Sequence, residues 1–109
     1  MIMRISQVDL FEVSIPPIPP IAVVMPKIYD ITLVRIMTDE GLTGWGECQG
    51  RKADLETRFQ SYLGQDPLAI DAFAQTDAIN CALLDIEGQA WGVPMWRLFG
   101  AQVRDRVPV

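Results

Sequence analysis

The sequence contains no histidine, which removes the side chain that most often serves as a general base or a metal ligand near neutral pH. Its two cysteines, Cys48 and Cys81, are too few for a disulfide scaffold and lack the spacing of a zinc site. We interpret them as reduced thiols and expect a cytoplasmic protein. No apolar run approaches the roughly 20 residues that a membrane-spanning helix requires, and the first residues lack the apolar segment of a secretory signal. We therefore expect no membrane partner.

Basic residues are also scarce. Nine Lys and Arg residues stand against 14 Asp and Glu, which gives a net charge of −5, and the basic residues are scattered along the chain. Because a surface that binds nucleic acid needs clustered Lys and Arg, we expect no nucleic-acid partner. With 109 residues, 50% of them hydrophobic, the chain has room for one domain with a modest core.

The centre of the predicted fold is a β-hairpin. Asp39-Glu40-Gly41 is typical of a type I turn closed by a glycine with positive φ, and it connects a strand over residues 28–38 to a strand over residues 42–47. Apolar residues occupy both faces of the first of these strands, which predicts a central strand packed on both sides. Together with the strand before it, the hairpin predicts an antiparallel meander.

The returning strand carries two glycines on one face. Gly44 and Gly46 have the same parity, so a bulky element can lie close against the backbone there. Trp45 and Glu47 then point to the opposite face.

Residues 2–15 predict the first strand, but its alternation changes phase. Val8 and Leu10 share one parity, whereas Phe11 and Val13 share the other. A bulge near Leu10, or burial of both faces, would explain the change. The apolar connection over residues 16–27 contains five prolines. We expect it to cover another part of the protein, although a stiff surface linker remains an alternative.

After the meander the pattern becomes helical. Residues 55–63 predict an amphipathic helix ended by Gly64, and Asp66-Pro67 predicts a second helix start that continues to Phe73. A third helix is expected from about residue 77 to residue 91, with Gly88 as a site of close packing, and residues 95–99 predict one more short turn. The expected fold class is α+β, a three-stranded antiparallel meander followed by a small helical bundle.

The last nine residues predict a linker. Residues 101–106 are polar, and Val107-Pro108-Val109 is typical of the opening of another strand, which has no partner here. We therefore expect one domain over residues 1–100, and over residues 101–109 a linker and the start of a strand whose own domain is absent.

Several short motifs in this order resemble the N-terminal capping domain of the enolase superfamily, in its mandelate racemase and muconate lactonizing enzyme branch. The motifs are Leu33-Val34-Arg35-Ile36, Thr38-Asp39-Glu40-Gly41, Gly44-Trp45-Gly46-Glu47, Leu63-Gly64-Gln65-Asp66-Pro67, Ala82-Leu83-Leu84-Asp85-Ile86-Glu87-Gly88, Gly92-Val93-Pro94, Leu98-Phe99-Gly100 and Arg104-Asp105-Arg106-Val107-Pro108. The resemblance covers essentially the whole chain.

The resemblance implies that the chain closes over a modified (β/α)-barrel, absent here, that would continue from residues 107–109. In that family the barrel binds Mg²⁺ and supplies the acid and base residues that remove a proton next to a carboxylate. We therefore expect the chain alone to be inactive, with no cofactor, no catalytic residue and no metal ligand of its own. The implied partners are the barrel and, through it, a small carboxylate substrate such as a sugar acid; self-association into a homo-oligomer is left open.

The family's capping role also implies which residues face the substrate. Two loops match, residues 16–29 and residues 48–52. The residues that we expect to cap the substrate are Pro17, Ile18, Pro19, Met25, Tyr29, Glu47, Gln49, Arg51 and Lys52. Arg51 and Lys52 either reach an anionic substrate or are solvated surface charges. Glu47 is expected to be a hydrogen-bonding partner for the loops, and Asp85 and Glu87 to be structural or solvent-facing.

One departure from the family pattern is that the helical segment between Pro67 and Ala82 is shorter by several turns. Two alternatives stand beside the capping domain. One is a free-standing α+β module that binds a partner or dimerises through its apolar faces, and the other is a truncated, inactive gene product. Dinucleotide binding is disfavoured, because the glycines at 41, 44 and 46 reverse the usual fingerprint and lie in a hairpin.

Overall fold

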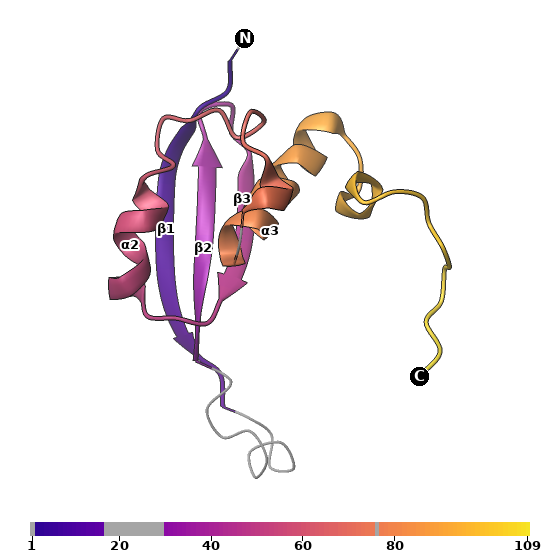
Figure 1. Ribbon diagram of the computed structural model, residues 1–109, viewed down its shortest axis with the longest axis horizontal. Coiled ribbons are helices and arrows are strands. Elements are labelled where there is room, and N and C mark those ends of the chain that lie inside the picture. The colour runs from indigo at the N-terminus through magenta and orange to yellow at the C-terminus, as the bar shows by residue number, and fades with distance from the viewer. Residues whose placement is uncertain (1, 17–29, 76) are drawn as a thin grey trace.

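The computed structural model describes residues 2–16, 30–75 and 77–109. Its sheet consists of β1 (Ile5–Ser14), β2 (Asp30–Thr38) and β3 (Thr43–Cys48), antiparallel and in the order β1-β2-β3 (Figure 1). The predicted meander and the central position of β2 are confirmed. The turn between β2 and β3 is closed by Gly41 with a φ of +83°, as its sequence predicts.

The change of phase in β1 arises at its beginning. Ile5 is paired with Thr38 and Gln7 with Met37, so Ser6 is the extra residue of a bulge. The bulge places Ile5 on the same buried face as Val8 and Leu10. The prediction of a bulge near Leu10 was therefore wrong, because register depends on the partner strand as well as on the alternation of β1 itself.

The helical part contains α2 (Lys52–Gln60), the 3-10 turn η1 (Ala72–Ala74), α3 (Asp77–Trp91) and the 3-10 turn η2 (Met95–Leu98). The third predicted helix and the turn after it are confirmed, and Gly88 does pack closely, with Val93 and Met95 against it. In the described part of the chain, no helix combines the length and apolar character needed to cross a membrane. Residues 101–109 are exposed and form neither helix nor strand.

The helix predicted after Asp66-Pro67 was wrong. The side-chain carboxylate of Asp66 accepts a hydrogen bond from the Leu68 amide. The backbone carbonyl of Asp66 accepts a second one from the Ala69 amide, and the two bonds complete a single turn. Asp71 then caps η1 by accepting a hydrogen bond from the Phe73 amide. Two aspartates so close together each begin a separate short turn, so no continuous helix forms.

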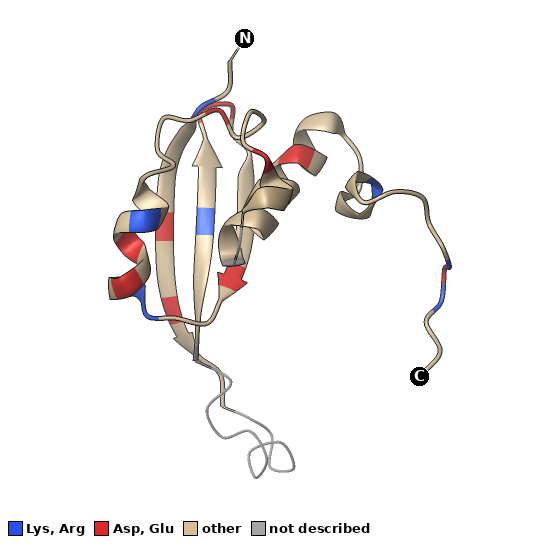
Figure 2. Cartoon of the chain, in the orientation of Figure 1, with Lys and Arg blue, Asp and Glu red and all other residues tan. Residues whose placement is uncertain are grey.

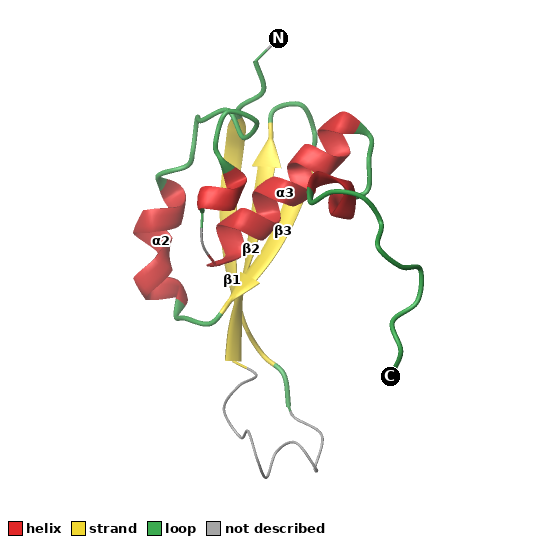
Figure 3. Ribbon diagram, turned by 45° about the vertical axis from the view of Figure 1, so that its right-hand side comes forward, coloured by secondary structure: helices red, strands yellow, loops and turns green. Residues whose placement is uncertain are grey.

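The helices cover one face of the sheet (Figure 3), and α3 lies directly on β3. A Cβ atom at Gly44 would overlap the carbonyl oxygen of Ala82, and one at Gly46 would overlap that of Ala78. The predicted close approach over these two glycines is confirmed. The core between the layers includes Ile5, Val8, Leu10, Val34, Ile36, Phe59, Ile79, Leu83 and Ile86.

No described helix packs on the opposite face of the sheet, where the β2 residues Ile31, Leu33 and Met37 are half-buried. The described residues therefore do not bear out the prediction that β2 is packed on both sides. Phe11 is 39% exposed and Trp45 is 45% exposed. The Arg35 guanidinium lies 5.2 Å from the centre of the Phe11 ring and 5.6 Å from that of Trp45, and it donates to the Asp9 carboxylate at 2.8 Å. A paired arginine over two aromatic rings shields this apolar face in place of a second layer.

The outer edge of β3 is closed by side chains of α3. The Trp45 amide donates to the Asp85 carboxylate at 3.0 Å, and the Gln89 side chain donates to the Thr43 carbonyl at 2.7 Å. These bonds occupy backbone groups that would otherwise recruit a further strand. Asp85 is therefore structural, as expected.

Candidate functional site

The two loops that the family resemblance singles out leave the sheet at the same end. In an antiparallel meander of three strands, the last residues of β1 and β3 lie at the same end of the sheet, and β2 begins at that end. Ser14 and Asp30 therefore lie near Cys48, and the loop after β3 runs across this end of the sheet to α2 (Figure 1). The predicted capping residues Pro17, Ile18, Pro19, Met25 and Tyr29 lie outside the described residues.

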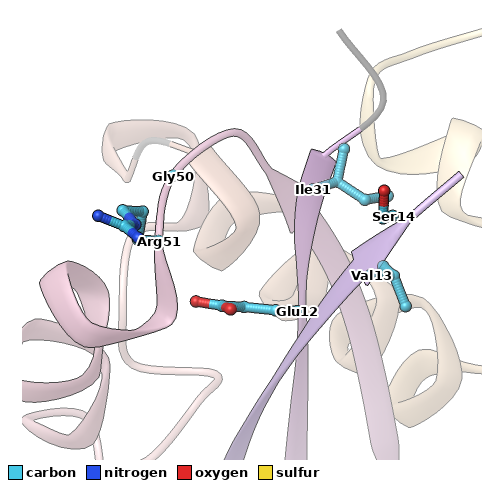
Figure 4. A pocket seen from close by; sticks show the side chains of 6 residues that line it. All are labelled: Glu12, Val13, Ser14, Ile31, Gly50 and Arg51. Atoms are coloured by element: carbon cyan, nitrogen blue, oxygen red, sulfur yellow. The ribbon is translucent and has the colours of Figure 1, made fainter. Parts of the chain in front are cut away.

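A surface cavity of about 400 Å³ opens at this end of the sheet, where the two loops leave it. Figure 4 shows Glu12 reaching from β1 toward the loop that carries Gly50 and Arg51. The lining residues are Glu12, Val13, Ser14, Ile31, Gly50 and Arg51.

The loop after β3 is held to the sheet at two points. The hydroxyl of Thr32, a fully buried residue, donates to the Gly50 carbonyl at 2.6 Å. The Glu12 carboxylate accepts a hydrogen bond from the Lys52 amide at 2.7 Å. Because the N-cap residue of α2, Arg51, makes no side-chain cap, Glu12 supplies from β1 the acceptor that this helix end needs. Gly50 has a φ of +144°, which strongly favours glycine at this bend.

Arg51 lies between these two anchored backbone groups, so its backbone is held on both sides. Its side chain is exposed and lines the cavity, and no carboxylate of the described residues lies within 4.0 Å of its guanidinium. Glu12 lines the same cavity but accepts from the Lys52 amide. The cavity therefore presents a cation that an incoming anion can reach.

The other predicted capping residues lie elsewhere. The ammonium of Lys52 lies 4.0 Å from the Glu56 carboxylate along α2. Gln49 is exposed but does not line the cavity, and Glu47 is exposed on the open face of the sheet, opposite Leu33. Of the predicted residues that the structure describes, only Arg51 lines the cavity.

Sequence reasoning missed four lining residues, namely Glu12, Val13, Ser14 and Ile31, whereas Gly50 lies in the predicted loop over residues 48–52 but was not among the residues named. The signal for them was the topology, because a meander brings the end of its first strand beside the end of its third. No local motif marks these residues.

The described residues offer no donor set for a metal ion. Within residues 2–16, 30–75 and 77–109, no group of three or more Cys, Asp or Glu side chains lies close enough to hold one. The basic residues that the structure describes are spread along the chain, from the start before β1 through β2, the loop before α2, α2 and η2 to the C-terminal segment (Figure 2). The fit to Mg²⁺ is therefore poor in this part of the protein.

No protein-family model matches the sequence. A D-galactonate dehydratase of Variovorax paradoxus is 35% identical over 99 residues, which cover 70% of this chain and 26% of that protein. Since 70% of 109 residues is about 76, the relative carries residues in the matched stretch that this chain lacks. The shortening expected between Pro67 and Ala82 would account for this difference.

Solved structures match over most of the chain. An isomerase from Streptomyces coelicolor has a TM-score of 0.76 and 28% identity, covering 98% of this chain and 33% of that protein. A mandelate racemase/muconate lactonizing enzyme from Roseovarius nubinhibens has a TM-score of 0.69 and 25% identity, covering 94% and 34%. An enolase-superfamily member from the same organism, solved with magnesium, has a TM-score of 0.70 and 27% identity, covering 92% and 34%.

The three-stranded meander with its helices on one face thus defines an α+β domain of the enolase type. The chain belongs to the enolase superfamily, in the mandelate racemase and muconate lactonizing enzyme branch, and corresponds to its N-terminal capping domain. It spans about a quarter to a third of the length of the proteins that it matches.

Proposed function

We propose that this chain is the capping domain of a longer Mg²⁺-dependent enzyme that removes a proton next to a carboxylate, with a sugar acid as the substrate class. The relatives support this proposal, because they include a D-galactonate dehydratase and a superfamily member solved with magnesium. The metal, held by the barrel, would stabilise the charge that develops on the substrate carboxylate. The residues of this chain bind one end of the substrate and exclude water.

The observation that carries the proposal is the position of Arg51. Both backbone neighbours of this residue are tied to the sheet, and its guanidinium is unpaired among the described residues at the end of the sheet where both loops leave. An arginine on an anchored backbone presents a planar guanidinium that can donate two parallel hydrogen bonds to a carboxylate. We propose that Arg51 contacts the substrate anion, and that the enzyme works in the cytoplasm.

The test compares Arg51→Ala with Lys52→Ala in the longer protein, over a series of sugar acids. Losing a charge-assisted hydrogen bond costs roughly 1.5–3 kcal/mol, which lowers kcat/KM by about tenfold or more. The loss should lie mainly in KM, because Arg51 would bind ground state and transition state alike. Lys52→Ala is the matched control, since its side chain points along α2, and it should change kcat/KM less than twofold. Equal effects of the two variants, or none, would contradict the proposal.

The runner-up function is a free-standing interaction module. The exposed aromatic rings of Phe11 and Trp45 on the open sheet face favour it. Sedimentation of the 109-residue chain distinguishes the two, because a module of this kind forms a concentration-dependent dimer that Trp45→Ser abolishes. A monomer at all concentrations excludes dimerisation through this face.

A further inference from the structure

Glu87 is a buried carboxylate that neither the fold nor the proposed site uses. It lies on α3, it is 8% exposed, and no described residue donates a hydrogen bond to it or forms an ion pair with it. Burial, and then the negative charge of Asp71, raise the pKa of Glu87 above its ordinary value of 4.5. Of the two expected environments, structural or solvent-facing, the low exposure of Glu87 favours the structural one, because the turns η1 and η2 pack beside it. Its carboxylate oxygens keep contact with solvent through a surface cleft, because no described side-chain oxygen is both buried and without a hydrogen bond. Partial loss of water without a partner still disfavours the charged form.

The surroundings of Glu87 suit a cation with an apolar stem. Glu87 lines a surface cleft of about 520 Å³ together with Phe73, Trp91, Val93, Arg97 and Leu98. Phe73 and Trp91 are 59% and 57% exposed, so ring faces stand open at the rim. Aromatic faces attract Lys and Arg side chains, and a buried carboxylate strengthens that preference.

The only basic side chain that lines the cleft among the described residues does not satisfy Glu87. The guanidinium of Arg97 lies 5.5 Å from the centre of the Trp96 ring, and no ion pair within 4.0 Å joins it to Glu87. Phe99 extends the rim, with its ring 5.4 Å from that of Phe73, edge to face. The result is an apolar surface with an unmatched negative charge at its centre.

We propose that this cleft receives an arginine or lysine side chain from the barrel part of the longer protein, which packs on the aromatic rim. The proposal rests on the proposed function for the existence of that barrel. Charge complementarity favours this face over the open face of the sheet, where Arg35 is already paired with Asp9. The matching proteins are about three to four times as long as this chain, so they have the residues to cover it.

The central test compares the shift in melting temperature that one substitution causes in the 109-residue chain with the shift that it causes in the longer protein. The two shifts should have opposite signs. Glu87→Gln keeps the shape and removes the charge. In the 109-residue chain it removes a partly desolvated carboxylate that has no partner there, and it should raise the melting temperature by up to roughly 4 °C. In the longer protein it removes the partner of a buried cation and should lower the melting temperature by a similar amount. Glu40→Gln, in the exposed β2–β3 turn, is the matched control and should change neither. Shifts of the same sign in both settings, or no shift in the longer protein, would overturn the proposal.

A second measurement tests the cleft alone. Propylguanidinium, which mimics an arginine side chain, should produce a saturable change in Trp91 fluorescence in the 109-residue chain, and propionate should produce none. Trp91→Phe identifies the reporting ring by abolishing the change. An unaltered response in Glu87→Gln would overturn the proposal.

The two proposals can fail separately. The Glu87→Gln shift in melting temperature could reverse its sign in a longer protein that does not act on carboxylic acids. That result would support the docking surface and reject the proposed function. A longer protein that acts on carboxylic acids, but in which the Glu87→Gln shift does not reverse its sign, would reject the docking surface alone.

Discussion

Replacing Gly46 by alanine should separate α3 from the sheet. A Cβ at this position would overlap the carbonyl oxygen of Ala78 and lie 2.8 Å from its carbonyl carbon, whereas ordinary contacts begin at 3.4 Å. The obstructing atoms are backbone atoms, so the whole helix must move by at least 0.6 Å, the difference between these distances. The helix carries Ile79, Leu83 and Ile86 into the core.

The cost follows from the packing that is lost. A gap of about 0.5–1 Å forfeits a quarter to a half of each dispersion contact, and overpacking of a core costs about 1–3 kcal/mol or more. We expect Gly46→Ala to reduce the free energy of unfolding by about 3 kcal/mol, which corresponds to a fall of roughly 12 °C or more in Tm.

Urea denaturation followed by circular dichroism measures this loss. Gly64→Ala is the control, because Gly64 has a φ of +81° and nothing within 4 Å of its Cβ position. It measures the strain of a side chain at positive φ without any overlap, about 1–2 kcal/mol, a strain that Gly46 does not carry. If Gly46→Ala cost less than Gly64→Ala, the close seating of α3 on β3 would be refuted.

Two further predictions concern the end of the sheet with the cavity and the open face of the sheet. Thr32→Val removes the hydrogen bond to Gly50, worth about 1 kcal/mol, and should speed amide hydrogen exchange at Lys52 about fivefold, whereas Thr38→Val, at the other end of β2, should leave Lys52 unchanged. Equal exchange in both variants would show that Thr32 does not hold the loop. The side-chain amide of Gln7, and then Arg35, lower the pKa of Asp9 from 3.8. The stability that the Asp9 carboxylate contributes is therefore present above pH 3.8 and is lost as the pH falls through its folded pKa. Asp9→Asn should destabilise the chain by under about 1 kcal/mol at pH 7, and this difference should shrink as the pH falls below 3.8. A difference that does not shrink on acidification would contradict this assignment.

The meander and its glycines were predictable, because each rests on a local rule with a physical cause. Gly41 provides the positive φ of the turn, and Gly44 and Gly46 share a face by the two-residue period of a strand. The start and end of α3 followed from its apolar spacing and from Gly92 with Pro94 behind it.

The errors and omissions occur where a local pattern had to predict a tertiary partner. The bulge lies at Ser6 because β2 sets the register, and the open face of β2 is shielded by Arg35, a residue that no alternation pattern distinguishes. The burial of Glu87 depends on two short turns distant from each other in sequence. Likewise, Glu12 joins the candidate site through the backbone of Lys52, which no side-chain motif encodes.

The claim that the chain caps a barrel is tested most directly by the reading frame that follows the codon for Val109 in the gene. We predict that the frame continues for several hundred codons, with strands alternating with helices and with Asp or Glu after successive strands. A stop codon directly after Val109 would contradict the account.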